Sequence, residues 1–222
     1  TNVIFNDKGF NGVVVINSFT GISISEDGLV TAGSGENWDE LVRQTVDAGF
    51  AGIEALSLVP GTVGGAPVNN IGAYGQEISE TLVSVRAFDV TMHDFITLAN
   101  RECGFAYRTS RFKDADHGRF IITSITLQLH RADASYAAPD YPALIGELQK
   151  QNIERPTINN VRDAVISVRT HKLPDPKVVA NSGSFFKNAI VDEETVARIK
   201  ASYPEVPVYP YGDLFKIPAG WL

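Results

Sequence analysis

Short runs of apolar and β-branched residues predict that β-strands dominate the first part of the chain. We expect strands at residues 12–19, 21–28 and 121–130, and a hairpin of two strands at 81–90 and 94–98. Within the last of the single strands, alternation assigns one set of side chains to one face: Ile121, Thr123, Ile125, Leu127 and Leu129. The pattern therefore predicts a sheet-rich N-terminal part.

Apolar residues at helical spacing follow the second strand and a short further strand. We expect Asn37 to cap this helix, with Glu40 as its capping-box partner, and Gly49 to end it. Its apolar stripe comprises five residues: Trp38, Leu41, Val42, Thr45 and Val46. An amphipathic helix is therefore predicted between residues 37 and 49.

Two further helices are predicted in the second half of the chain. Val161, Val165 and Val168 share one helical face, and Pro174 ends any helix by that point. Asp192 is expected to cap the last helix, whose inward stripe comprises Val196, Ile199 and Tyr203.

Two segments lack a clear period. Residues 132–156 have weak periodicity and several prolines, so we expect a connection or an insertion there. Residues 204–222 are proline-rich and should be extended. Taken together the elements indicate an α+β protein with a sheet-rich first unit and a smaller C-terminal unit that begins near Pro174.

Composition excludes several classes of function. The chain of 222 residues has a net charge of −7, which argues against general binding of nucleic acids. No apolar run is long enough for a membrane span or a signal peptide, so we expect no membrane partner and a cytoplasmic protein. Cys103 stands alone, and His93, His117, His130 and His171 are scattered, so no disulfide framework or metal site is expected.

The stretch PGTVGGAPVNNIGAYG, residues 60–75, holds five glycines, two prolines and no charged residue. Glycines let a backbone approach a ligand closely, and successive N–H groups can form an anion-binding concavity. It is not a Walker A loop, because no Lys-Ser/Thr pair follows Gly64 or Gly65. The pattern alone leaves two interpretations open, a ligand-binding loop and a buried structural turn.

The stretch GSGENW, residues 33–38, lies where a strand meets a helix, as a dinucleotide-binding fingerprint would. Trp38 replaces the third glycine of that fingerprint, and an indole there would prevent close packing of helix and strand. A tight turn into a capped helix is therefore the preferred interpretation.

Cationic residues gather in two places. In CGFAYRTSRFK, residues 103–113, Arg108 lies among aromatic residues, an arrangement that suits a planar carboxylate, although a solvated basic turn remains an alternative. The stretch 169–188 brings four cations near Ser184 and suggests a diphosphate site: Arg169, Lys172, Lys177 and Lys187. The alternative for Ser184 is a structural serine in a turn, since the final glycine of a hydrolase GxSxG motif is absent.

Three segments together resemble the UDP-N-acetylenolpyruvoylglucosamine reductase (MurB) family in order and spacing. They are GSGENWDELVRQTVDAGFAGIEALSLVPGTVGGAPVNNIGAYG, CGFAYRTSRFK and KLPDPKVVANSGSFFKN, and the resemblance covers nearly the whole chain. It implies an FAD-binding fold of the vanillyl-alcohol oxidase type over residues 1–173. A smaller α+β substrate-binding domain would follow over residues 174–222.

The resemblance implies FAD as cofactor and NADPH as co-substrate. In the family, the loop matching residues 60–75 lies along FAD, and a charge buried there without a partner would be costly. The cofactor-binding residues carried over are Pro60, Gly61, Thr62, Val63, Gly64, Gly65, Pro67, Asn70, Gly72, Ala73, Tyr74 and Gly75.

The implied reaction reduces UDP-N-acetylglucosamine enolpyruvate to UDP-N-acetylmuramate, a step of peptidoglycan synthesis on which cell-wall biogenesis, cell shape and cell division depend. Arg108 matches the family's arginine at the substrate carboxylate, and Ser184 matches its proton donor. The substrate-binding residues carried over are Tyr107, Lys172 and Asn188, with Tyr141 as the match, at a different spacing, to a tyrosine of the longer-loop subtype.

Two departures from the family concern the chain ends. The family's first FAD-binding loop ends in a motif that resembles TNVIF, residues 1–5, and its catalytic glutamate lies beyond residue 222. We therefore expect these residues alone to bind FAD poorly and to show no turnover. A non-catalytic flavin-binding or nucleotide-sugar-binding module is the alternative, and a serine hydrolase is a distant third.

Overall fold

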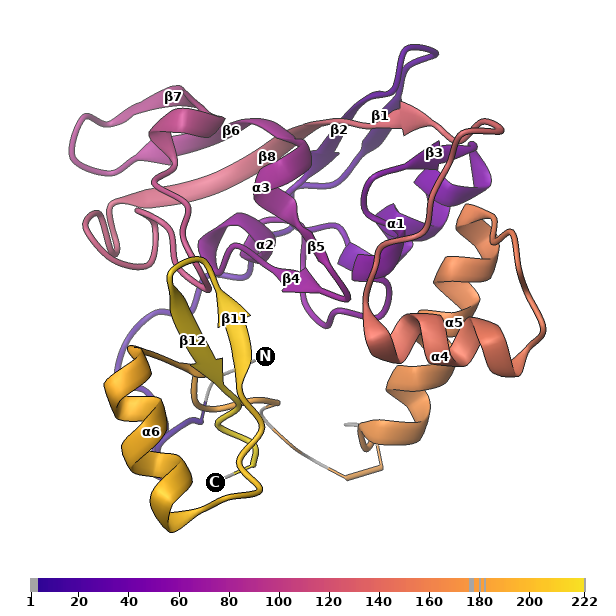
Figure 1. Cartoon of the computed structure of the whole chain (residues 1–222). Helices are drawn as coiled ribbons and strands as arrows, with labels where there is room; N and C mark the ends of the chain where they lie inside the picture. The colour runs from indigo at the N-terminus through magenta and orange to yellow at the C-terminus, as the bar shows by residue number, and fades with distance from the viewer. Residues whose placement is uncertain (1–3, 176–177, 180, 182, 222) are drawn as a thin grey trace. The chain divides into compact units, whose positions relative to one another are not determined.

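Figure 1 shows the computed structural model of the chain, which describes residues 4–175, 178–179, 181 and 183–221. Contacts divide the chain into a larger unit, Gly12–Val179, and a smaller one made of Thr1–Asn11 with Ala180–Leu222. The assignment of residues 1–173 to FAD and of 174–222 to substrate stays a prediction.

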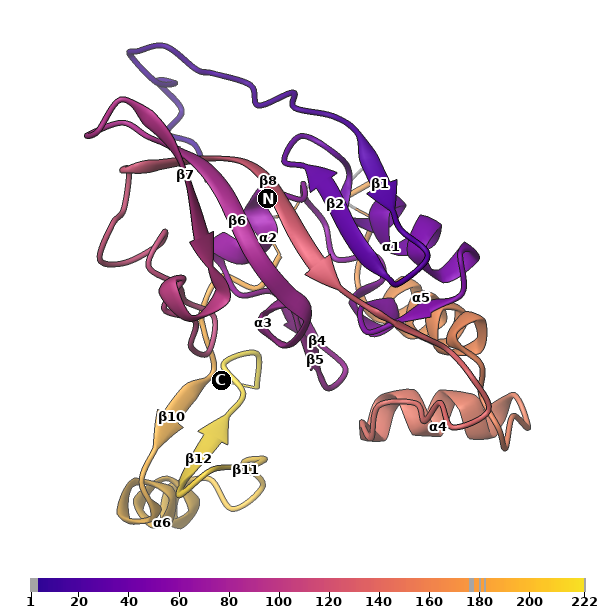
Figure 2. The ribbon, with the colours of Figure 1, turned by 90° about the horizontal axis from the view of Figure 1, so that it is seen from above.

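A five-stranded antiparallel sheet forms the larger unit, in the order β1-β2-β8-β6-β7 that Figure 2 shows from above. Its strands are β1 (Ile22–Ile24), β2 (Leu29–Gly33), β6 (Leu82–Asp89), β7 (Asp94–Ala99) and β8 (Phe120–Gln128). The predicted hairpin is confirmed, because β6 and β7 pair from Ser84↔Ala99 to Asp89↔Asp94.

Short elements complete the larger unit. Two small ladders join β3 (Phe50–Ala51) to β9 (His130–Arg131) and β4 (Gly72–Ala73) to β5 (Gln76–Glu77). The helices are α1 (Trp38–Asp47), α2 (Gly65–Val68), α3 (Ile78–Thr81), α4 (Pro142–Lys150) and α5 (Ile158–Lys172), with short 3-10 helices η1 (Glu54–Leu56) and η2 (Asn100–Glu102). None of the helices in the described ranges has the length and apolar character of a membrane span.

The main core lies between one face of this sheet and helices α1, α2 and α3. Val30 and Val85 point inward from two strands and pack with Trp38 and Leu41 of α1, and all four are fully buried or nearly so. The opposite face is open to solvent, where Val83 and Phe95 are exposed. This one-sided burial explains the alternating pattern of the strands.

Helix α1 forms as its sequence predicts. Asn37 accepts the N–H of Glu40 at 3.0 Å, and the whole predicted stripe is buried. Gly49, in the left-handed region at φ +83°, ends the helix. The capping-box partner was wrong, because the Glu40 carboxylate instead accepts from Arg43 and Gln44, and Arg43 lowers the pKa of Glu40 to about 2.

Two strand predictions need correction. In the described part of the chain no strand pairs with residues 12–19, and Val13 to Ile16 are 73–86% exposed, so that run stays irregular despite its β-branched residues. In β8, a bulge shifts the pairing from Arg86↔Ser124 to Ala87↔Ile122. The bulge reverses the alternation, and Ile121 is 48% exposed whereas Ile122 is 5% exposed.

Residues 132–156, predicted as a connection or an insertion, contain helix α4. Pro142 occupies its first turn, where a proline is tolerated, so prolines were a misleading signal here. Leu144 and Leu148 of α4 pack against α5 in a second core cluster. Helix α5 ends at Lys172, as predicted from Pro174.

In its described residues, the smaller unit contains a three-stranded antiparallel sheet and one helix. Its elements are β10 (Ala189–Val191), α6 (Glu193–Ser202), β11 (Tyr209–Tyr211) and β12 (Leu214–Ile217), with the sheet order β10-β12-β11. Asp192 caps α6 by accepting the Thr195 N–H, as predicted. Val196 is buried, but Tyr203 is 58% exposed and meets Trp221 edge-on, so its place in the inward stripe was wrong.

Asp89 closes the β6–β7 hairpin and is fully buried. Its carboxylate accepts from Arg119 at 2.7 Å and from the N–H groups of Thr91 and Met92 at 2.9 and 3.2 Å. The Arg119 bond, followed by these backbone bonds, lowers the pKa of Asp89 to about 2.

We expect Asp89→Asn to weaken the acid dependence of the free energy of unfolding. The folded-state pKa is about 2, and an unfolded aspartate titrates at about 3.9. Between these values the unfolded state binds about one more proton than the folded state. The stabilisation of the fold by the Asp89 carboxylate is therefore present above about pH 4 and lost as the pH falls towards 2.

Urea unfolding between about pH 2 and pH 5 measures this slope. The proton uptake on unfolding that this slope reports should be smaller by about one proton in Asp89→Asn than in the wild type. It should stay unchanged in Asp94→Asn, a control at an exposed position of the same hairpin. Equal slopes in the wild type and Asp89→Asn would contradict the assignment.

Candidate functional site

The glycine-rich loop (residues 60–75) begins as a backbone partner of the turn at 33–38. Gly64 N–H donates to the Ser34 carbonyl at 2.9 Å, and Val63 N–H donates to a carbonyl of the same turn at 2.9 Å. The turn therefore joins strand β2, helix α1 and the glycine-rich loop. The predicted tight turn into a capped helix is confirmed.

Several glycines at this junction are required by the packing of the protein itself. A Cβ on Gly64 would lie 2.7 Å from the Ser34 Cβ, and a Cβ on Gly35 would lie 2.8 Å from the carbonyl oxygen of Asn17. A Cβ on Gly33 would collide in the same way with the backbone of Phe19 and Thr20. These positions exclude any side chain unless the backbone moves.

Gly65 differs from its neighbour. Outside its chain neighbours and the backbone of its own helix, the nearest atom to a Cβ placed there would be Thr62 Oγ1, 4.0 Å away. Gly65, Thr62 and Gly64 line a cavity of about 210 Å³ together with Asn17 and four apolar residues, which are Val68, Phe112, Phe120 and Ile122. Small-molecule pockets usually measure roughly 300–1,000 Å³, so this cavity fits a part of a dinucleotide cofactor such as FAD. Its uncharged lining suits a flavin ring.

The second half of the loop holds Arg108. The Arg108 guanidinium donates to the Gly72 carbonyl, and its Nη1 lies 3.4 Å from both the Asn70 carbonyl and Glu77 Oε1. The Cζ atom lies 5.1 Å from the centre of the Tyr107 ring. The structure therefore brings the predicted carboxylate-binding arginine against the predicted cofactor loop.

Backbone strain concentrates at this place. Six described non-glycine residues have positive φ, and four of them lie in or beside the two loops: Leu58, Asn70, Tyr74 and Arg108, at φ +54°, +41°, +48° and +54°. Such conformations cost free energy and persist where surrounding contacts enforce them, often at ligand-binding sites. Asn70 is held in this way, because its side chain bonds to Glu77 and to the Ala106 carbonyl.

The tip of the loop meets another predicted residue. The Tyr74 and Tyr141 rings lie edge to face with centres 5.4 Å apart. Burial raises the pKa of Tyr74, against the opposing charge and hydrogen bond of Arg169. The Arg169 Nε is buried and has no hydrogen-bond partner in the described structure. Arg169 belongs to the cation cluster that the sequence predicted as a diphosphate site, and it lies three residues before Lys172 on the same helix.

For the remaining candidates the structure shows fewer contacts that bear on a function. Lys172 is exposed at the end of α5. Ser184 and Asn188 belong to the smaller unit, where Asn188 accepts the Ala219 N–H at 3.1 Å. Lys177 and the first three residues of TNVIF lie outside the described residues. The functional roles of all these residues stay predictions.

Cys103 is a core residue. It is fully buried, and burial raises the pKa of its thiol to about 11. A thiol that holds its proton at neutral pH is a poor nucleophile and metal ligand.

Comparison with known proteins supports the fold. The FAD binding domain family matches residues 1–91. The crystal structure of UDP-N-acetylenolpyruvylglucosamine reductase from Thermus caldophilus superposes with a TM-score of 0.50 at 20% identity, over 88% of this chain and 63% of that one. The predicted α+β FAD-binding fold of the vanillyl-alcohol oxidase type is confirmed.

Sequence comparison supports the family. The UDP-N-acetylenolpyruvoylglucosamine reductase of Aliivibrio fischeri is 44% identical over 100% of this chain and 62% of its own length. That of Cupriavidus pinatubonensis is 47% identical over 87% of this chain and 57% of its own length. The chain thus spans about three fifths of the length of these relatives. The motifs, the FAD-binding fold and these identities together show that the chain belongs to the UDP-N-acetylenolpyruvoylglucosamine reductase family.

Proposed function

We propose that the protein carrying this chain is an FAD-dependent oxidoreductase that uses NADPH to reduce UDP-N-acetylglucosamine enolpyruvate to UDP-N-acetylmuramate. The observation that carries the proposal is the position of Arg108, whose guanidinium is held by the backbone of the uncharged glycine-rich loop. Family membership supports the substrate class. Both substrates of this reaction are cytoplasmic metabolites, so the proposal includes a cytoplasmic location.

The glycine-rich loop would hold the cofactor through its backbone. Gly65 and Thr62 are exposed, line the cavity and leave space beside them. Bound FAD would supply hydride transfer, accepting a hydride from NADPH and delivering one to the methylene carbon of the enolpyruvyl group. Because the loop is uncharged, it could contact the flavin without burying an unpaired charge.

Arg108 would bind the carboxylate of the enolpyruvyl group. Addition of a hydride to the methylene carbon moves an electron pair onto the adjacent carbon, and that charge delocalises into the carboxylate. A guanidinium at this place stabilises the negative charge as it develops. The contacts of Arg108 with Gly72 and Asn70 keep the cation in place before substrate arrives.

Ser184 would supply the proton that completes the reduction. Its Oγ–H bond breaks as a new C–H bond forms at the carbon that carries the electron pair, and the serine then regains a proton from solvent. A serine hydroxyl is a weak acid, so it serves only as a positioned donor to a strongly basic carbon.

Cations and tyrosines would bind the nucleotide-sugar part of the substrate. Lys172 and Asn188 are assigned to the diphosphate, with Tyr107 and Tyr141 as further contacts. The buried Arg169 Nε beside Tyr74 offers one more donor to an anion, because it has no partner in the described structure. Arginine is well suited to phosphate oxygens.

A non-catalytic flavin-binding or nucleotide-sugar-binding module remains the second candidate. A binder would need neither a proton donor nor a cation fixed at the flavin loop, and for this reason we prefer the enzyme.

A first test is FAD binding by the protein expressed from its complete gene. We expect a yellow protein with about one FAD per chain, whose visible absorbance bleaches on anaerobic addition of NADPH and recovers with the enolpyruvyl substrate. Absence of FAD binding would contradict the proposal. Bleaching without recovery would favour a protein that lacks the substrate reaction.

Gly64 and Gly65 form a matched pair. Gly64→Ala should destabilise the fold by about 1–3 kcal/mol, because its methyl group would collide with Ser34. Gly65→Ala should leave the stability of the apoprotein within about 1 kcal/mol but weaken FAD binding roughly tenfold, because its methyl group would enter the cavity. Thermal unfolding and FAD titration of the apoproteins measure both effects. FAD affinity equal to wild type in Gly65→Ala would remove this residue from the site.

Ser184→Ala should separate the two half-reactions. We expect reduction by NADPH to continue at nearly the wild-type rate and reoxidation by the enolpyruvyl substrate to slow by roughly 10²–10⁴-fold, the usual value of a positioned proton donor. Anaerobic stopped-flow absorbance records each step. Reoxidation at the wild-type rate would leave Ser184 as a turn residue, and equal slowing of both steps would indicate a damaged pocket.

A further inference from the structure

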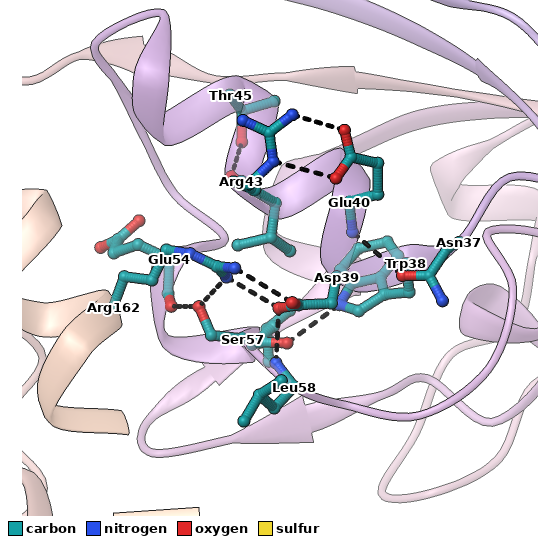
Figure 3. Close-up of polar contacts among 12 residues, drawn as sticks. Asn37, Trp38, Asp39, Glu40, Arg43, Thr45, Glu54, Ser57, Leu58 and Arg162 are labelled. Carbon is teal, nitrogen blue, oxygen red and sulfur yellow. Dashed lines mark hydrogen bonds and ion pairs between the residues drawn. The ribbon is translucent and has the colours of Figure 1, made fainter. Parts of the chain in front are cut away.

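The segment that leads into the glycine-rich loop, residues 56–58, is held by the first turn of α1 (Figure 3). Trp38 Nε1 donates to the Leu56 carbonyl at 3.0 Å, and the Asp39 carboxylate accepts the Leu58 N–H at 2.7 Å. Leu58 has φ +54°. A residue with a Cβ adopts this conformation only where its surroundings enforce it. Asp39 is one of the groups that enforce it.

Arg162 of α5 fixes this carboxylate. Its guanidinium donates to both Asp39 oxygens at 2.7 and 3.0 Å and to Ser57 Oγ at 2.8 Å (Figure 3). The side chains of Arg162 and Asp39 are only 12% and 24% exposed. Burial, the largest effect, tends to raise the pKa of Asp39, but the bonds from Arg162 and Leu58 outweigh it and the net pKa is lowered. The carboxylate is therefore charged at neutral pH.

Apolar contacts, and not only the ion pair between Arg162 and Asp39, hold helix α5 against the rest of the unit. Val161 and Val165 of this helix are fully buried in the second core cluster, together with Leu144 and with Ala55 of η1. Loss of the Arg162 guanidinium would leave these apolar contacts in place. Its specific consequence would be at Asp39 and at residues 57–58.

We propose that Arg162 is a positioning residue for the flavin site. It orients Asp39 and Ser57, and Asp39 in turn holds Leu58 in the conformation from which the glycine-rich loop begins in its FAD-binding geometry. This inference rests on the proposed function, since FAD must bind at residues 60–75. Helix α5 ends in the cations Arg169 and Lys172. One helix thus connects the entry of the cofactor loop with the residues assigned to the substrate.

The test measures FAD affinity by titration of apoproteins made from the complete gene, beside their thermal unfolding without FAD. Arg162→Met and Asp39→Ala should each raise the Kd for FAD about tenfold at a temperature where the apoprotein is folded. Asp39→Asn keeps an oxygen that can accept the Leu58 N–H, so it should raise the Kd less than Asp39→Ala. This graded rescue would not follow from a general loss of stability.

Arg43→Met is the matched control. Arg43 also forms a bidentate ion pair, with Glu40, but its side chain is exposed and its bonds join residues of α1 to one another. Its Kd should stay within about twofold of wild type. A wild-type Kd in Arg162→Met would overturn the proposal, whatever its unfolding temperature. An equal rise in Arg43→Met would overturn it too.

Two further outcomes are distinguished by design. Absence of FAD binding in the wild-type protein would overturn the proposed function itself, and with it this inference. Should Arg162→Met fail to fold, Arg162→Lys retains the charge and one donor group but not the two-pronged geometry. It should still raise the Kd several-fold, and an unchanged Kd would overturn the proposal.

Discussion

The close approach of the backbone at Gly64 to Ser34 is the constraint on which the rest of the site depends. Only a position without a Cβ allows the glycine-rich loop to come within hydrogen-bonding distance of the turn. That turn ends strand β2 and precedes helix α1. One contact between two backbone segments therefore sets the loop relative to both the sheet and the helix. The rest of the loop can remain open to a ligand because this part is fixed.

Features that depend on neighbouring residues were predicted well from the sequence. The Asn37 and Asp192 caps and the stripe of α1 were confirmed, since a side chain at the right spacing is sufficient for each. Features that depend on a distant partner were not. The bulge in β8 exists only because of its pairing with β6, and it moved Ile121 to the solvent face. Residues 12–19 have strand propensity, but strand propensity does not supply a neighbouring edge.

The candidate site shows the same division. The uncharged composition of residues 60–75 predicted a special loop, and the nearby Arg108 could be proposed from its motif. The contact of Arg108 with Gly72 spans 36 positions, and that of Arg162 with Asp39 spans 123. No local sequence pattern predicts a contact between residues so far apart in the chain. Arg169 was predicted as one of four clustered cations, but its unpartnered Nε beside Tyr74 becomes evident only in the folded protein.

The sequence left two interpretations of the glycine-rich loop open, and each describes different residues. Gly64 belongs to a buried structural turn, since the space for its side chain is filled by Ser34. Gly65 does not, since outside its chain neighbours and the backbone of its own helix no described atom comes closer than 4.0 Å to the position of its Cβ. A fold alone gives no reason for glycine at the second position, whereas a ligand that must reach the backbone does. The left-handed conformations of Tyr74 and Arg108 support the same conclusion, because protein packing alone rarely requires two such residues around one loop. The first glycine builds the loop, and the second leaves the space that the proposed cofactor would enter.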